Sequence, residues 1–429
     1  MPASEIHAEW AKRLAANLFK STKALPTDMD EAQRLALAWA LKDYAYRAWS
    51  VKPSDVMIVA SLVETLAAQT STRKFRSEIN AVSNWVAGIG DLTNGRMSEA
   101  LNRFDTACSQ FQALNRRDYA AQTQVPKIMA LSILGKHALA IDCARTTQLE
   151  FMDLGDLHGA AKVSNNLGNL LCQCSRYADA MPHFREAETL FEQVKDNDNS
   201  IVSGTGIAEV YASVGDFERA LRTYAKLIQR ADDQQLPMRR IVATEAVALV
   251  HLARGQYTNA LEGLENARQQ YDAMCMPQNV AVVEKQLADT YMDLRLLPEA
   301  LSLFEQAIAR FSALEMPVEH AWTLTQQGRT LAALGQSTES VKNCLRRAGE
   351  LFTEQGVTAG QATVLLASAE LALTRDETMA ADALARQAAE AFATCGLATG
   401  KAQADVIRAY SLLHRADIDA AAALFASTL

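Results

Sequence analysis

Two thiols and an imidazole lie close together in the stretch NNLGNLLCQCSRYADAMPH, residues 165–183. Cys172 and Cys174 form a C-x-C arrangement, and His183 follows nine residues after the second thiol. Thiolate and imidazole groups are the usual ligands of zinc, and paired thiols can carry redox chemistry. A structural zinc site needs four ligands at short spacing, and no second pair of such residues is nearby. The surrounding pattern must therefore decide whether these residues form a site.

That pattern is an internal repeat of 40 residues, which is marked by a short turn such as GDFERA at 215–220. Related hexamers recur at the same step in both directions, so the sequence predicts a repeat with no insertion or deletion. The small residue that closes each hexamer lies at Ala60, Ala100, Ala140, Ala180, Ala220, Ala260, Ala300, Ser340, Ala380 and Ala420.

Two further columns follow the same step. Twelve residues before the closing position is a small residue in most units, for example Gly88 and Gly168. Eleven residues after it is a bulky one, such as Phe111 or Phe191, although Phe352 and Phe392 fall one place later. Small residues let two helices approach closely, and large ones fill the space toward the next unit. Each unit is therefore predicted to be a helix of about 14 residues, a turn and a helix of roughly 18.

The predicted fold is all-α. We expect a right-handed superhelical solenoid of about nine to ten 40-residue helix hairpins over residues 36–429. Residues 1–35 are expected to form a separate N-terminal helical segment, and no sheet is expected because alternating apolar runs are absent.

The opening thiols fit this repeat as packing residues. Cys172 shares its column with small or apolar residues, and so does Cys174 apart from one arginine, so we interpret both as reduced thiols that behave as small hydrophobes. No metal, cofactor or catalytic residue is predicted. The members of the Cys172 column are Ser132, Ala212, Leu252, Met292 and Ala332.

Composition and charge exclude several classes of partner. The net charge is −8 with no block of basic residues, which argues against nucleic acid. The sequence has no run of 18 apolar residues to span a membrane, and its N-terminus lacks the pattern of a secretion signal. Seven scattered cysteines then indicate reduced thiols and a cytoplasmic location.

The columns over residues 36–429 resemble the 40-residue form of the tetratricopeptide repeat, which implies a solenoid that binds proteins or peptides. The segments LGNLL, LADTYMDLRLLPEALSL, LFTEQG and AFATCGL also resemble the repeat half of bacterial CHAT proteins, where a caspase-like peptidase domain follows. The chain is still in helical repeats at Leu429, so the peptidase activity cannot be assigned to any of its residues. Kinesin light chains and bacterial peptide sensors that regulate transcription or signalling have similar repeats.

The first helix of each pair lines the concave face in such repeats, so its residues are the predicted peptide contacts. Positions 15 and 11 before each closing residue are apolar near the ends, as at Trp85, Ile89, Leu365 and Ala369, and polar between them. Asparagines there can bond to a peptide backbone, and charged residues can select its side chains. The predicted binding residues are Lys162, Asn165, Asn166, Asn169, Glu209, Glu245, Lys285, Asp289 and Arg329.

The last predicted helix, ADIDAAAALFASTL, is almost wholly apolar, and solenoids usually end in a polar cap. A further domain, a partner chain or self-association is expected to cover it. The favoured function is a non-catalytic binding scaffold that senses a partner and regulates a CHAT-type peptidase or another effector. The alternatives are a peptide-responsive regulator and an enzyme with an unrecognised site.

Overall fold

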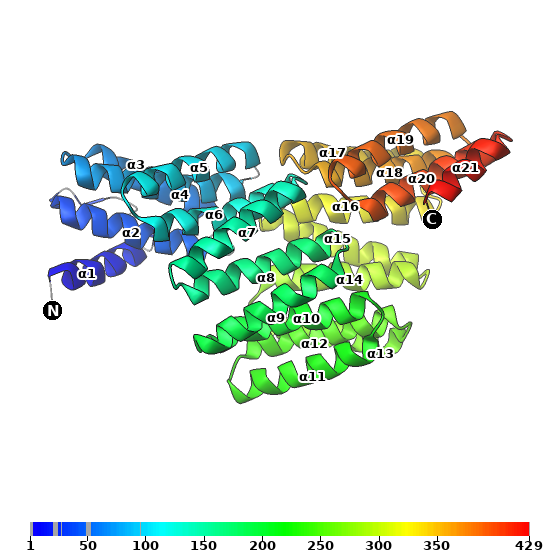
Figure 1. The fold of residues 1–429 in the computed structure, drawn as a ribbon. Helices are drawn as coiled ribbons and strands as arrows, with labels where there is room; N and C mark the ends of the chain where they lie inside the picture. The colour runs from blue at the N-terminus through cyan, green and yellow to red at the C-terminus, as the bar shows by residue number, and fades with distance from the viewer. Residues whose placement is uncertain (1–2, 20–24, 27, 49–52, 95, 429) are drawn as a thin grey trace. The chain divides into compact units, whose positions relative to one another are not determined.

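The computed structural model describes residues 3–19, 25–26, 28–48, 53–94 and 96–428. Over these residues it contains 21 helices and no strand, as the sequence predicts (Figure 1). None of these helices is both long enough and apolar enough to cross a membrane.

The chain divides into two compact units, residues 1–163 and 164–429. The first contains α1 (Ala3–Leu18), α2 (Glu31–Ala48), α3 (Pro53–Ala68), α4 (Arg73–Thr93), α5 (Met97–Ala113), α6 (Arg117–Ile133), α7 (His137–Asp153) and the start of α8 (Leu157–Gln173). The predicted limit of an N-terminal segment at residue 35 stays a prediction, and α2 begins at Glu31.

The second unit continues from α8 with thirteen further helices. These are α9 (Tyr177–Gln193), α10 (Asn197–Ser213), α11 (Phe217–Asp233), α12 (Pro237–Ala253), α13 (Tyr257–Ala273), α14 (Pro277–Asp293), α15 (Leu297–Ala313), α16 (Pro317–Ala333), α17 (Thr338–Glu354), α18 (Thr358–Thr374), α19 (Thr378–Thr394), α20 (Ala398–His414) and α21 (Ile418–Thr428).

Helices α5 to α20 are all 17 residues long, so the predicted alternation of a short and a long helix is wrong. The reason is that the turn within a helix pair and the turn between two pairs close in the same way. At each turn one residue adopts a positive φ, and the next residue donates its N–H back across the helix end, as Asp216 does to Tyr211 O at 2.8 Å. Non-glycine residues hold nine of these positions, among them Ser175 and Arg295, although the left-handed conformation costs them about 1–2 kcal/mol.

The positive-φ positions recur every 20 residues from Asn115 to Gly335 and then fall at Gly356, one residue late. The extra residue lies in the turn before α17, where the Ser337 hydroxyl accepts a hydrogen bond from the Ser340 N–H at 3.2 Å. The prediction of a repeat without insertion is therefore wrong beyond this point. The buried residues there are Val341, Ala381 and Ala421, each one place after Ser340, Ala380 and Ala420.

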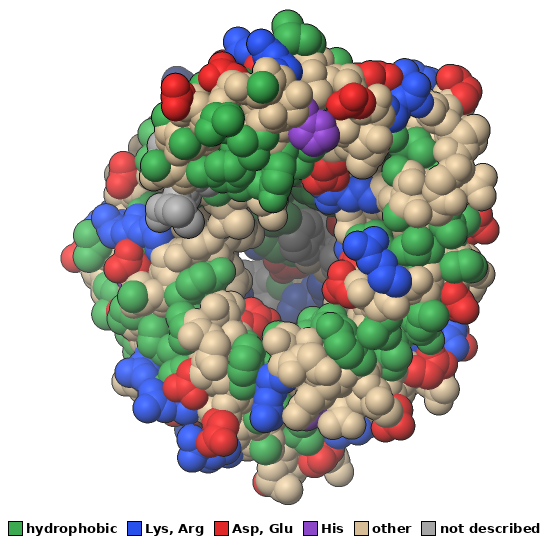
Figure 2. Space-filling view, turned by 90° about the vertical axis from the view of Figure 1, so that its right-hand side faces the viewer, with side chains coloured by type: hydrophobic (Ala, Val, Ile, Leu, Met, Phe, Trp, Pro, Cys, Tyr) green, Lys and Arg blue, Asp and Glu red, His purple; other side chains and the backbone are tan. Residues whose placement is uncertain are grey.

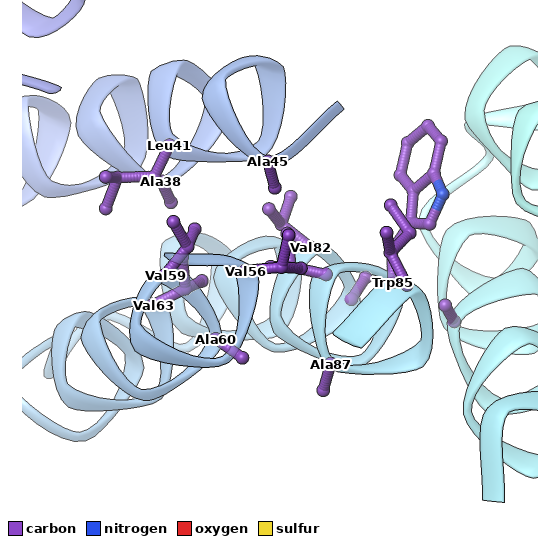
Figure 3. Packing of buried hydrophobic residues seen from close by; sticks show 14 of the residues in the cluster. Ala38, Leu41, Ala45, Val56, Val59, Ala60, Val63, Val82, Trp85 and Ala87 are labelled. Atoms are coloured by element: carbon purple, nitrogen blue, oxygen red, sulfur yellow. The ribbon is translucent and has the colours of Figure 1, made fainter. Parts of the chain in front are cut away.

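Small and large residues meet inside each unit as the columns predict. The ring of Phe184 occupies the space that a Cβ on Gly168 would need, at 2.8 Å, and Phe104 does the same opposite Gly88. In the first unit, α2, α3 and α4 direct Leu41, Val59 and Val82 into a common core (Figure 3).

The even-numbered helices are the first helices of the pairs, and several of them contact the next even-numbered helix directly, as α14 does with α16 and α16 with α18. Among the described helices no pair of successive odd-numbered helices is in comparable contact. Closer packing on one side means that each unit curves toward its even-numbered helices, which places them on the concave side.

Candidate peptide-binding surface

The concave side of the second unit presents one equivalent residue from each even-numbered helix. We call this set the inner ridge, and none of its members is buried. It consists of Asn169 (α8), Glu209 (α10), Leu249 (α12), Asp289 (α14), Arg329 (α16), Glu370 (α18) and Tyr410 (α20).

The amide-rich end of the predicted site lies on α8. Lys162 and Asn169 are exposed, whereas Asn165 and Asn166 are half-buried. Asn165 Oδ1 accepts a hydrogen bond from Ser203 Oγ of α10 at 3.0 Å, so this residue joins two helices. Asn166 and Asn169 make no side-chain hydrogen bond with the described residues, so their amides remain open to a ligand.

Glu245 joins α12 to its neighbours. Its carboxylate accepts hydrogen bonds from Gln286 Nε2 of α14 at 2.9 Å and from the Tyr271 hydroxyl of α13 at 2.7 Å. Burial, followed by this carboxylate, raises the pKa of Tyr271, so the phenol stays protonated and continues to donate. Hydrogen bonds from two neighbouring helices therefore hold the Glu245 carboxylate in place.

A second set of contacts continues across α14, α16 and α18. Lys285 Nζ donates to Asp289 at 2.7 Å, and the other oxygen of Asp289 accepts from Gln326 Nε2 at 3.2 Å. Arg329 donates to Gln326 at 3.0 Å and to both oxygens of Glu370 at 2.9 and 3.1 Å. Four residues of the predicted mixed-charge strip, Glu245, Lys285, Asp289 and Arg329, thus belong to a ladder of bridges that links successive even-numbered helices from α12 to α18, and Glu209 lies outside this ladder.

The sequence prediction missed three members of this ladder. Glu370 was missed because a step of exactly 40 residues ignores the residue inserted at Ser337. The step therefore selects Leu365 and Ala369, and Ala369 is fully buried. The late positions of Phe352 and Phe392 are the signal that could have corrected the count. Gln286 and Gln326 lie one place after a predicted column, and no sequence pattern marks them.

The apolar N-terminal end of the predicted face was expected to line the concave surface, but its residues are buried. Trp85 and Ile89 are buried, and Trp85 Nε1 donates to the Tyr46 hydroxyl at 3.0 Å. The rings of Tyr46 and Phe111 pack against Trp85, and because both Trp85 and Ile89 are buried they do not line an open surface.

Glu209 is exposed on the inner ridge, yet loss of surrounding water raises the pKa of its carboxyl. An accessible side chain with this property has protein on several sides, which fits a concave surface. Burial, and then the Glu209 charge, raises the pKa of the half-buried Cys172 thiol to about 11. Burial also raises the pKa of the Cys174 thiol. Both thiols are therefore protonated at neutral pH.

The imidazole of His183 lies 3.9 Å from a carboxylate oxygen of Glu186 on the same helix. Over the described ranges, no cluster of three or more His, Cys, Asp or Glu residues could hold a metal ion. On the face drawn in Figure 2, acidic and basic side chains are intermixed.

Comparison with known proteins gives the following matches. The family model for the soluble NSF attachment protein, SNAP, matches residues 92–242, which is less than half of the chain. No curated protein matches.

Among solved structures, a Rap protein complexed with Competence and Sporulation Factor is similar with a TM-score of 0.54 at 11% identity, over 84% of this chain and 99% of that one. Aspartyl phosphate phosphatase F from Bacillus subtilis gives 0.54 at 14% identity, over 83% and 96%. The Rap conjugation gene regulator of plasmid pLS20 in complex with the Phr* peptide gives 0.53 at 12% identity, over 84% and 95%.

The chain is a tetratricopeptide-like helical repeat solenoid. At such low identity these likenesses show the fold alone, and function must be argued from the surface itself.

Proposed function

We propose that this chain is a non-catalytic scaffold that binds a protein or an extended peptide along the inner ridge of residues 164–429. The observation that carries this proposal is that seven consecutive even-numbered helices each present an accessible side chain at one equivalent position. Packed helices are about 8–10 Å apart, and an extended chain advances about 3.3 Å per residue. Every third residue of a bound peptide would therefore meet a ridge residue.

The ladder of bridges supports the same proposal through rigidity. Bridges between α12 and α14, α14 and α16, and α16 and α18 fix these four helices relative to one another before a ligand arrives, and the ridge residues Asp289, Arg329 and Glu370 take part in them. A surface that is already ordered loses less conformational entropy on binding. The open amides of Asn166 and Asn169 can donate to and accept from a peptide backbone of any sequence.

The nature of the ligand is supported by the structural neighbours. The names of two of them state a bound factor or peptide, Competence and Sporulation Factor in one and the Phr* peptide in the other. We propose that the present chain likewise senses a peptide or a protein segment and passes this signal to an effector.

Two effectors are proposed. The resemblance of several segments to the repeat half of bacterial CHAT proteins favours a CHAT-type peptidase. The alternative, a peptide-responsive regulator of transcription or signalling, is favoured by the fold likeness to a Rap conjugation gene regulator. Measuring whether the purified chain changes the activity of a candidate peptidase, or the DNA binding of a candidate regulator, distinguishes them.

The surface itself can be tested by panning a random peptide display library on the full chain and measuring the selected peptides by fluorescence anisotropy. Asn169→Ala combined with Glu209→Ala removes two ridge contacts, each worth about 0.5–1.5 kcal/mol, so binding is expected to weaken by roughly five- to 150-fold. The matched control is Asn259→Ala, an exposed asparagine on the odd-numbered helix α13. Unchanged binding by the double variant, or an equal loss in the control, would refute the proposal.

A further inference from the structure

Packing is incomplete next to the single insertion in the repeat. A pocket of about 490 Å³ lies between α14, α16, α17 and α18, and another of about 530 Å³ is lined by α17, α18 and α19. Leu345 and Leu371 line both pockets, so only a thin layer of side chains separates them at this point. The extra residue at Ser337 starts α17 one position late, so the pocket lies directly beside the shift in the repeat.

The floor of the first pocket is apolar. Ala332, Val341, Leu345, Ala367 and Leu371 contribute to it. Three of the four lining residues of α16 are small, namely Gly328, Ala332 and Ala333, and two earlier repeats have a larger residue at the position of Ala332. The residues equivalent to Ala332 in α12 and α14 are Leu252 and Met292.

The opposing helix α17 has a leucine where Phe104, Phe184 and Phe304 stand in other repeats, as α13 also does at Leu264. Gly328 of α16 faces Leu345, and a Cβ on this glycine would lie 3.1 Å from Leu345 Cδ2. In two earlier repeats the equivalent glycines, Gly88 and Gly168, face a phenylalanine ring. A shorter side chain therefore occupies the position where an aromatic ring fills the space in those repeats.

Charged residues stand at the wall and rim of this pocket. Arg329 and Glu370 form the wall, and their two hydrogen bonds to each other satisfy both charges. Asp293 and Arg295 also line the pocket and are exposed. The interior therefore offers no unpaired charge to a charged group, whereas the rim offers an acceptor and a donor to polar main-chain groups.

We infer that this pocket receives an apolar side chain, of the size of Leu, Met or Phe, from a peptide that follows the inner ridge. Arg329 and Glu370 belong both to the ridge and to the pocket wall, so a peptide on the ridge passes over the pocket. The Leu252 and Met292 side chains at the equivalent positions show which kind of group fits this place in the repeat. The volume exceeds that of one side chain and leaves room for the adjoining peptide groups.

This inference deepens the proposed function and rests on it, but its first test needs no natural ligand. The probes are N-acetyl-L-leucinamide and N-acetyl-L-asparaginamide, which have the same two peptide groups and similar side-chain size. Methyl NMR of the full chain is expected to show saturable shifts at Val341, Leu345 and Leu371 with the leucine probe and none with the asparagine probe. Equal shifts with both probes, or none with either, would overturn the inference.

Ala332→Met fills the pocket with the side chain that the preceding repeat has, and it is expected to abolish these shifts. The matched control is Ala212→Met, the same repeat position in α10, outside the pocket. Shifts that persist in Ala332→Met, with both variants folded by circular dichroism, would contradict the inference.

Library peptides separate this inference from the proposed function. If they bind the ridge, and neither probe shifts these methyl groups, the pocket inference fails and the proposed function stands. If the leucine probe shifts the methyl groups and no peptide binds, the pocket stands and the proposed function fails. If peptides bind and the leucine probe also shifts the methyl groups, Ala332→Met should weaken peptide binding. The loss should be largest for peptides that have an apolar residue at one fixed position.

Discussion

A pair of glycine-to-alanine substitutions tests the packing of the repeat by the sign of its effect. Gly206 of α10 and Gly349 of α17 are both inside helices. A Cβ on Gly206 would lie 2.6 Å from Cδ1 and 2.7 Å from Cζ of the Phe184 ring, which is far inside van der Waals contact. A Cβ on Gly349 would meet only Val364 Cγ1, at an ordinary 3.7 Å.

The magnitudes follow from two opposing terms. In a helix interior, alanine is more favourable than glycine by about 0.8–1.0 kcal/mol. Gly349→Ala gains this term without a clash, so it should stabilise its unit by about 1 kcal/mol. Gly206→Ala gains the same term but must displace the Phe184 ring, and overpacking a core costs about 1–3 kcal/mol. Because Phe184 is also held against Gly168, it has little room to move, and a net loss of about 1–2 kcal/mol is expected.

The assay is urea denaturation of the full chain followed by circular dichroism, together with hydrogen exchange of peptides from α8–α10 and from α17. Local exchange is informative because the stability of a solenoid is nearly a sum over its repeats. Exchange in α8–α10 should become faster in Gly206→Ala, and exchange in α17 slower in Gly349→Ala. Phe184→Leu should remove most of the clash in the Gly206→Ala background. Stabilisation by Gly206→Ala, or an equal loss from both substitutions, would refute the packing described here.

Two further predictions concern buried groups. Glu284 is fully buried and accepts hydrogen bonds from Arg310 Nε at 2.9 and 3.1 Å, and the Arg268 guanidinium lies 4.0 Å away, so Arg310→Met should cost up to about 3–5 kcal/mol in urea denaturation. Adding Glu284→Gln should restore part of this loss because no buried charge then remains, and no restoration would contradict that explanation. For Cys172, a pKa raised to about 11 means that alkylation by iodoacetamide should be much slower at pH 8 than that of the exposed Cys275 and should accelerate toward pH 11. Mass spectrometry of the labelled peptides measures both rates, and similar rates at pH 8 would contradict the assigned burial.

Much of the fold could be predicted from the sequence because stacking identical helix pairs imposes the same size limits on each repeat. A residue such as Ala220 must be small since it is fully buried where two helices meet, and Phe311 must be large since it packs against Ala281 and Ala307 in the core. These demands recur at a fixed step and are therefore readable as columns. The turn residues are less readable, because Ser175, Arg295 and other non-glycine residues adopt positive φ at the same places as glycine.

The candidate site could be predicted only as a position on the repeat. The register identified Asn165, Glu245, Lys285, Asp289 and Arg329 as residues of the even-numbered helices, but it could not say that all five are bound to neighbouring side chains.

The sequence by itself determined the helix pair and its period, because these depend on side-chain size at regular spacing, whereas the helices of the concave side were expected only from the resemblance to tetratricopeptide repeats. The tertiary structure decided where the register shifts at Ser337, which side chains bridge successive helices and where a pocket remains open. Bridges such as that of Arg329 to Glu370 join residues 41 positions apart, and they form only when two helices are packed at one particular offset. The single residue inserted at Ser337 changes the offset between the neighbouring helices, although the 20-residue spacing of the turns is the same before and after it.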